Sequence, residues 1–175
     1  DDIVTRGFDA GIRIGEMVER EMVAVRIGPD LRMAVVGSPA YFAARGKPKH
    51  PRDLVDHDCI NYRRRTRGDV YRWELTEDGK DFEIAVDGRV LLNDGEIMTR
   101  AALDGLGLAY VVEASVRDHL AERRLVQVLQ TYLTPFPGFF LYYPSRLHLS
   151  PKLEAFVDFY RLSGKRTTAR SPRRS

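Results

Sequence analysis

Residues 91–113, LLNDGEIMTRAALDGLGLAYVVE, contain the feature that most constrains the fold of this chain. An apolar run is followed by acidic residues, a stretch with helical spacing, two glycines and a second apolar run. This order predicts a strand, a helix and another strand, with Gly105 and Gly107 supplying the helix stop and the tight entry into the second strand. Parallel strands need a crossover connection of this kind, so we expect an α/β protein.

The other apolar runs extend this pattern over the whole chain. Glycine and proline punctuation and apolar periodicity predict strands over residues 8–15, 22–28, 31–37, 59–63, 71–75, 82–86, 125–129 and 138–144. Helices are predicted over residues 38–46, 51–58, 114–122 and 150–164, with Ser38 as an N-cap and Gly164 as a stop.

Two details of this pattern are more specific. Asp78 and Gly79 predict a hairpin turn between strands 71–75 and 82–86, with Trp73 on the buried face. The alternation of helices and strands favours a mostly parallel sheet.

Residues 8–15 are expected to form a buried inner strand, although nothing precedes them that could supply its neighbours. Either the chain is a fragment of a larger domain, or later strands close around this one.

Charge and composition exclude several classes of protein. The formal net charge is +3, but residues 164–175 contain five basic residues and no acid, so the remainder is about −2 (3 − 5). The body is therefore not a nucleic-acid-binding surface by charge, and residues 164–175 are expected to be a basic, disordered tail. No apolar run approaches the ~20 residues of a membrane helix, so no membrane partner is expected. A single cysteine, Cys59, excludes an intrachain disulfide and fits a reducing compartment.

The chain contains no recognisable catalytic or metal-binding motif. Its four histidines are not spaced as zinc ligands, and no GxSxG, P-loop or GxGxxG pattern is present. Asp94 and Glu96 could form an acid/base pair, but Asn93 and Glu96 fit a capping box that explains these side chains without catalysis. Capping combined with a ligand contact stays open. We therefore predict no catalytic residue, no metal site and no cofactor.

Ligands of parallel sheets bind beyond the carboxyl ends of the strands. Arg63, Arg64 and Arg65 follow the strand predicted over residues 59–63, and guanidinium groups match carboxylates and phosphates. The run indicates an anionic small molecule, although exposed arginines are more often solvated surface.

Four long segments resemble, in order, the effector-binding (substrate-binding) domain of LysR-type transcriptional regulators. They include the phrases IRIGE, VVGSPAYFAARG, DHDCINYR, LLNDGEIMTRAALDGLGLAYVVE and FPGFFLYYP, and the resemblance extends from Asp1 to Arg161. It implies a two-lobed fold like that of type II periplasmic binding proteins, with the first lobe incomplete. Lobe I would contain residues 1–36 and the return 138–163, and lobe II residues 37–137.

The resemblance also implies a function. Such a domain is not an enzyme; it binds a small-molecule effector between the lobes of a cytoplasmic homo-dimer or tetramer. DNA would be bound only through an N-terminal winged helix-turn-helix that is absent from this sequence. Position by position, the effector site is expected to include Ile14, Gly15, Gly37, Ser38, Arg63, Asn93, Asp94, Val112 and Glu113.

One departure and three rival interpretations accompany the resemblance. Relatives commonly have proline where this chain has Val112, so the loop at that position is expected to be less rigid. The rivals are a periplasmic solute-binding protein of the same fold, an enzyme that uses Asp94, Glu96 or Glu113, and a dimerisation module with an empty cleft.

Overall fold

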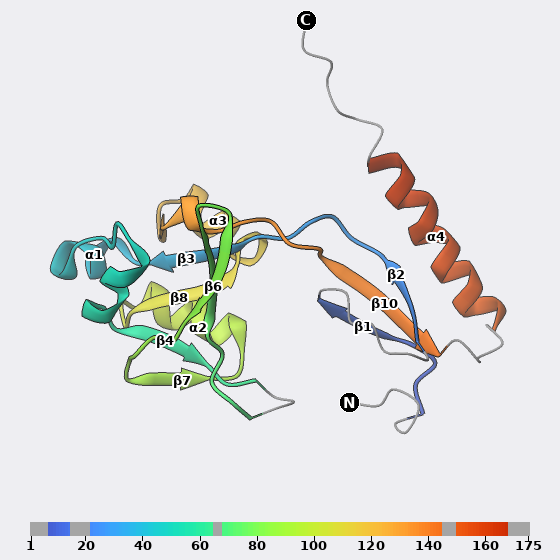
Figure 1. Cartoon of the computed structure of the whole chain (residues 1–175), viewed down its shortest axis with the longest axis horizontal. Coiled ribbons are helices and arrows are strands. Elements are labelled where there is room, and N and C mark those ends of the chain that lie inside the picture. Colours follow the sequence, from blue (N-terminus) through green and yellow to red (C-terminus); the bar gives the residue numbers. More distant parts are fainter. Residues whose placement is uncertain (1–6, 15–21, 65–67, 145–149, 168–175) are drawn as a thin grey trace, which may run out of the picture. The chain divides into compact units, whose positions relative to one another are not determined.

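The computed structural model describes residues 7–14, 22–64, 68–144 and 150–167. These residues form two compact units (Figure 1): unit 1 falls within residues 1–31 and 136–175, and unit 2 is the continuous segment Arg32–Pro135. The sequence-based division had placed residues 32–36 in the first lobe and residues 136–137 in the second. The structure moves both boundaries: residues 33–37 form a strand inside the sheet of unit 2, and Phe136 pairs with Leu31 in unit 1.

Unit 1 is a three-stranded antiparallel sheet with one helix packed on it. The sheet contains β1 (Gly11–Ile14), β2 (Met22–Arg26) and β10 (Phe139–Pro144), with β10 in the middle. The helix α4 (Pro151–Thr167) contributes Val157 to a small core with Val25, Leu141 and Tyr143. The sequence predicted that Gly164 would stop this helix, but α4 continues to Thr167. One interior glycine costs a helix only about 1 kcal/mol, so it does not have to end there. Most of the predicted tail, residues 168–175, lies outside the described residues.

Among the described residues, β1 lies at an edge of its sheet, whereas the sequence predicted a buried inner strand. In the described part of unit 1, β1 pairs along one side only, with β10. Its side chains Ile12 and Ile14 are 54% and 46% exposed. Its apolar residues therefore indicated a strand correctly but did not indicate its position in the sheet.

Unit 2 is built on a five-stranded mixed sheet. It contains β3 (Met33–Gly37), β4 (Cys59–Tyr62), β7 (Val90–Leu92), β8 (Leu108–Val112) and β9 (Val126–Val128), in the order β7-β4-β8-β3-β9. β4 is parallel to β7 and β8, whereas β3 is antiparallel to β8 and β9. The expectation of a mostly parallel sheet is therefore wrong. The predicted strand–helix–strand unit is present as β7, α2 (Gly95–Leu103) and β8, with β4 between the two strands.

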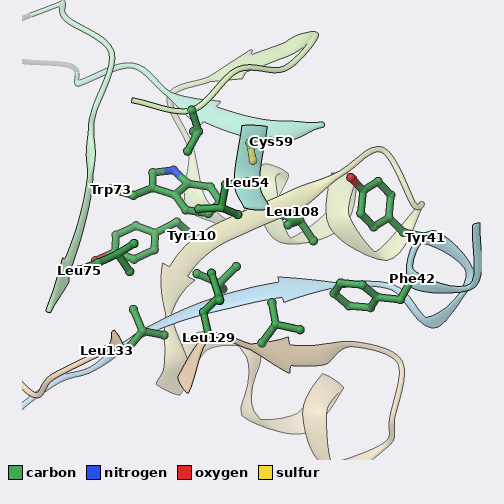
Figure 2. Close-up of a cluster of buried hydrophobic side chains, with 13 residues drawn as sticks. Tyr41, Phe42, Leu54, Cys59, Trp73, Leu75, Leu108, Tyr110, Leu129 and Leu133 are labelled. Atoms are coloured by element: carbon green, nitrogen blue, oxygen red, sulfur yellow. The ribbon is translucent and has the colours of Figure 1, made fainter. Parts of the chain in front are cut away.

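The two faces of this sheet bury different cores. One face packs against α2 and α3 (Glu113–Ala121), through Met98 and Val116 among others. The other packs against α1 (Pro39–Arg45), the 3-10 helices η1 (Pro51–Asp56) and η2 (Gln130–Tyr132), and the hairpin β5 (Trp73–Glu77) and β6 (Lys80–Ile84). Figure 2 shows this second core, in which Trp73 is 1% exposed and stacks on Tyr110 at 5.3 Å. The predicted hairpin and the predicted burial of Trp73 are confirmed.

Two glycines hold the start of β4 in place. A Cβ atom at Gly88 would overlap the carbonyl oxygen of Cys59, and one at Gly107 would overlap that of Asp58. The backbones that lead into β7 and β8 can therefore approach β4 closely from both sides. This packing buries the Cys59 side chain, and that burial raises the pKa of the thiol to about 12.

Candidate functional site

The carboxyl ends of β4, β7 and β8 meet at one edge of the unit 2 sheet, which we call the carboxyl edge. Tyr62 lies opposite Leu92 and Ile60 lies opposite Ala109, so the residues that follow come level across three neighbouring strands. Adjacent strands are about 4.8 Å apart, which places the backbones that flank Arg63 within about 10 Å of each other. The residues brought together in this way are Arg63, Asn93, Asp94, Val112 and Glu113.

Asp94 is the N-cap of α2. Its Oδ1 accepts hydrogen bonds from the backbone N–H groups of Glu96 at 2.9 Å and of Ile97 at 3.1 Å. The predicted capping box of Asn93 and Glu96 is therefore wrong. The helix begins one residue later than expected, at Gly95, so the residue before it is Asp94, and the Asn93 side chain lies exposed at the edge.

The second helix at this edge, α3, begins immediately after β8. Val112 occupies its N-cap position with φ −64° and ψ 125°, and an isopropyl side chain cannot accept a hydrogen bond from the first turn. The Glu113 N–H donates to the carbonyl of Arg32 at 2.8 Å, which ties the start of α3 to the start of β3. Since the N-termini of α2 and α3 both face the carboxyl edge, their dipoles favour negative charge there.

Arg63 and Arg64 have different roles. Arg64 donates from Nε to Asp69 Oδ1 at 3.0 Å, pairs through Nη2 with Oδ2, and lies 5.2 Å from the centre of the Tyr71 ring. Arg63 is held by its backbone, whose N–H donates to Leu92 O at 2.7 Å, while its side chain is exposed. No described acidic group pairs with the Arg63 guanidinium. Arg63 is thus available to a ligand, whereas Arg64 stabilises its own loop. Arg65 lies outside the described residues.

Gly37 and Ser38 lie at the opposite edge of the sheet. β3 runs against β8, so Val36 lies opposite Ala109 and Gly37 comes level with the beginning of β8 rather than with its end. The four residue steps from Leu108 to Val112 along β8 separate the two edges by about 13 Å. These two residues therefore do not share a site with the carboxyl edge, contrary to the expectation from the sequence.

The surroundings of these two residues explain them structurally. A Cβ at Gly37 would lie 2.9 Å from Leu108 Cδ2 and 2.9 Å from Phe42 Cζ. Ser38 is buried, and its Oγ accepts from the Tyr41 N–H at 3.2 Å, which confirms its predicted role as the N-cap of α1. In unit 1, Ile14 is the last residue of β1, and Gly15 lies outside the described residues.

Sequence reasoning missed two residues at the carboxyl edge. The carbonyl of Arg32 receives the start of α3, and Tyr71 donates its N–H to the Tyr62 carbonyl at 2.7 Å, beside Arg63. The Tyr71 ring stacks on Tyr110, and burial raises the pKa of the Tyr71 hydroxyl, so it is protonated at neutral pH. In the sequence, Tyr71 is the aromatic residue that follows the arginine run 63–65. Nothing in the local sequence predicts that the segment leading into the hairpin returns to β4.

The chemistry available at the carboxyl edge is recognition through charge and hydrogen bonds. The Asp94 carboxylate already accepts two backbone hydrogen bonds, so its observed role is that of a helix cap. Within the described ranges, no three His, Cys, Asp or Glu side chains are grouped as a metal site. Among those same residues, no helix is long and apolar enough to cross a membrane.

The two-unit α/β architecture is a fold like that of type II periplasmic binding proteins. The regulatory domain of CrgA from Neisseria meningitidis has the same fold, with a TM-score of 0.74, 24% identity, and coverage of 91% of this chain and 77% of that one. The regulatory domain of AphB in Vibrio vulnificus gives a TM-score of 0.74 at 23% identity, over 90% of this chain and 76% of that one.

Sequence comparison then identifies the family. The family model described as LysR substrate binding domain matches residues 1–163, and the chain belongs to this family. A putative transcriptional regulator of Pseudomonas aeruginosa is 45% identical over 95% of this chain and 55% of its own length. The HTH-type transcriptional regulator PgrR of Escherichia coli is 39% identical over 93% of this chain and 54% of its own. The predicted resemblance and fold class are confirmed, and the chain spans about half the length of these relatives.

Proposed function

We propose that this chain is the effector-sensing part of a LysR-type transcriptional regulator. A small molecule binds it, and DNA is bound by a winged helix-turn-helix in another part of the regulator. Family membership and the regulator names of the relatives support this assignment. We further propose that the regulator acts in the cytoplasm as a homo-dimer or tetramer and catalyses no reaction.

The observation that carries the proposal is the arrangement of the carboxyl edge. Arg63 is exposed and follows β4, the middle of three adjacent strands, and the strands on either side of β4 lead into the N-termini of α2 and α3. We infer an effector with at least one carboxylate or phosphate, because guanidinium groups and helix N-termini both bind oxyanions. Asp94 and Glu113 lie at the same edge, so the effector is also expected to offer hydrogen-bond donors. Ile14 and Gly15 stay predictions from the family resemblance.

Coupling to DNA then follows from population shift. An effector that binds one conformation of the regulator more tightly than another shifts the equilibrium by its differential affinity, about 1.4 kcal/mol for each factor of ten. By linkage, DNA bound elsewhere in the regulator changes effector affinity by the same factor.

The rival interpretations gain less support. A periplasmic solute-binding protein shares the fold, but the relatives that match over most of this chain are described as transcriptional regulators. For an enzyme, the candidate acids were Asp94, Glu96 and Glu113, and the first of them is engaged as a helix cap. A dimerisation module with an empty cleft does not explain why Arg63, which pairs with no acidic group among the described residues, follows the strand between those that lead into α2 and α3.

A ligand screen tests the proposal. Small carboxylates and phosphates are screened by thermal shift, because a compound that binds the native state raises its stability. Arg63→Gln is expected to weaken binding of an anionic hit roughly 10- to 100-fold, the effect of losing a charged hydrogen bond. Arg117→Gln, which removes the same charge from an exposed position of α3, is the control and should bind as the parent protein does. Unchanged affinity of Arg63→Gln for every anionic hit would refute the anion assignment.

DNA binding is tested separately. Fluorescence anisotropy with operator DNA should show a change in affinity when the hit is added to the longer regulator. The present chain alone is expected to show no sequence-specific binding to the same DNA. A specific shift by this chain would contradict the proposed division of roles.

A further inference from the structure

A pocket of about 300 Å³ opens at the edge of the unit 2 sheet opposite the carboxyl edge. It lies where the parallel strands begin, between α1, the segments that lead into β4 and β7, and the turn from α2 to β8. Its lining residues include Tyr41, Ala44, Arg45, Asp58, Arg89 and Leu106. None of them belongs to the candidate effector site, and the two edges are separated by the length of β8, about 13 Å.

The lining of the pocket contains two guanidinium groups, Arg45 and Arg89, and two carboxylates, Asp58 and Asp104. Arg45 Nη2 lies 3.1 Å from Asp58 Oδ2, and Arg89 Nε lies 3.5 Å from Asp58 Oδ1. One carboxylate thus faces two guanidinium groups, and each guanidinium has five N–H donors. The other acid in the lining, Asp104, is paired with Arg100 at 3.3 Å. Because Asp104 is paired with Arg100, which is not a lining residue, the guanidinium groups of Arg45 and Arg89 share the single carboxylate of Asp58.

The burial of these side chains determines which atoms a ligand can reach. The Asp58 side chain is 21% exposed, whereas those of Arg45 and Arg89 are 53% and 82% exposed. The carboxylate therefore forms the floor, and the guanidinium groups form an accessible rim. A ligand anion can therefore bind the guanidinium groups of the rim without displacing the Asp58 carboxylate.

The floor is fixed by a buried polar group. The Asp58 N–H donates to the Tyr41 hydroxyl oxygen at 2.9 Å, and that hydroxyl lies 3.1 Å from His57 Nδ1. Burial lowers the pKa of His57 and raises that of Tyr41, so both are uncharged at neutral pH. The position of the Asp58 backbone, and with it the floor of the pocket, is therefore set before a ligand arrives.

The remaining wall is apolar. Ala40 and Ala44 of α1 line it together with Leu106, an apolar side chain that is 49% exposed. A bare inorganic anion would leave this wall in contact with water. The combination of a cationic rim with a small apolar wall matches an anion that carries a hydrocarbon group.

We propose that this pocket is a second small-molecule site, which binds an organic carboxylate with its oxygens on Arg45 and Arg89 and its hydrocarbon group against Ala44 and Leu106. The site is independent of the carboxyl edge and does not rest on the assignment of the effector.

Titration of the ¹⁵N-labelled chain with phenylacetate tests the proposal. At low ionic strength, where screening is weak, NMR spectra should show saturable shifts at the amides of Ala40, Ala44 and Leu106 and at the Arg89 Nε–H. Phenylacetamide has the same shape without the charge and should produce no saturable shift. Phenylacetate shifts that map outside the pocket, or an equal response to phenylacetamide, would overturn the proposal.

Matched variants separate this site from the carboxyl edge. Arg89→Gln removes a mostly exposed side chain, and Ala44→Glu places a competing carboxylate at an exposed helix position, so neither disturbs the core. Each should weaken phenylacetate binding at least roughly tenfold. Arg63→Gln and Arg117→Gln should leave it unchanged. The proposal fails if Arg89→Gln and Ala44→Glu bind like the parent, or if Arg63→Gln abolishes the response.

Discussion

At the scale of single residues, the start of α2 shows how one position can change the role of a side chain. Asparagine and aspartate are about equally good N-caps, so the sequence Asn93-Asp94 does not indicate which of them caps the helix. The structure assigns the role to Asp94 and leaves Asn93 exposed at the carboxyl edge. The pair thus divides into one residue that holds the helix and one that is available to a ligand.

This division predicts different effects on stability. Asp94→Ala should lower the free energy of unfolding by about 1 kcal/mol, because two N–H groups lose their acceptor. Asn93→Ala should change it by less than about 0.5 kcal/mol, as for other exposed positions. Urea denaturation followed through the fluorescence of Trp73, the single tryptophan, measures both. A larger loss for Asn93→Ala would restore the capping box predicted from the sequence.

At the scale of elements, positions were predictable and directions were not. The predicted strands 59–63 and 138–144 and the predicted helix 38–46 match β4, β10 and α1 closely, because side-chain periodicity and helix caps are local signals. The alternation of a strand is the same in either direction. Nothing local therefore showed that β3 runs against β8. Gly37 and Ser38 had been assigned to the site from the family resemblance alone, and the direction of β3 places them at the opposite edge.

The candidate site was predictable to the same extent. Arg63, Asn93, Asp94, Val112 and Glu113 come together because each follows a strand of the parallel set, a rule that needs only the order of elements. Arg32 and Tyr71 reach this edge through long-range backbone hydrogen bonds, and sequence spacing does not reveal such contacts.

The end of β8 yields a prediction about backbone rigidity. Val112 has φ −64°, a value that proline adopts, and the paired register of β8 with β4 ends at Ala109. Val112→Pro should therefore raise the free energy of unfolding by about 0.4–1 kcal/mol, by restricting the unfolded chain. Differential scanning calorimetry would show this as a higher Tm.

Val111→Pro is the matched contrast. Because the Glu113 N–H bonds to Arg32 O, the alternation of an antiparallel ladder makes Val111 and Ala34 a hydrogen-bonded pair. Proline at Val111 should thus cost about 3 kcal/mol or more. Equal destabilisation by both substitutions would show that Val112 is also held by its N–H.

At the scale of the whole molecule, unit 2 contains a buried thiol whose reactivity shows whether this unit is folded. Cys59 is the single cysteine of the chain and is buried at the start of β4. Since the folded state raises its pKa to about 12, the protonated thiol is favoured there. The corresponding stability is fully present below the ordinary thiol pKa and is lost as the pH rises above it.

We therefore expect Cys59 to react with a disulfide reagent at pH 8 only as fast as unit 2 opens. Labelling should be slow in buffer, become rapid in denaturing urea, and slow further when a ligand of unit 2 is bound. Glutathione in the same buffer gives the rate of an unprotected thiol. Labelling of the native protein at that rate would disprove the proposed protection.

The place of β10 in unit 1 has a consequence for how the protein is made. β10 is the middle strand, and β1 and β2 pair with it and not with each other. Residues 27–138, which include all of unit 2, leave the ribosome between β2 and β10. Among the described residues, β10 is the strand with which β1 and β2 pair, so the sheet of unit 2 can close before these two pairings form. A translational pause after Pro135 would therefore prolong the period in which the edges of β1 and β2 that pair with β10 stay open to other chains.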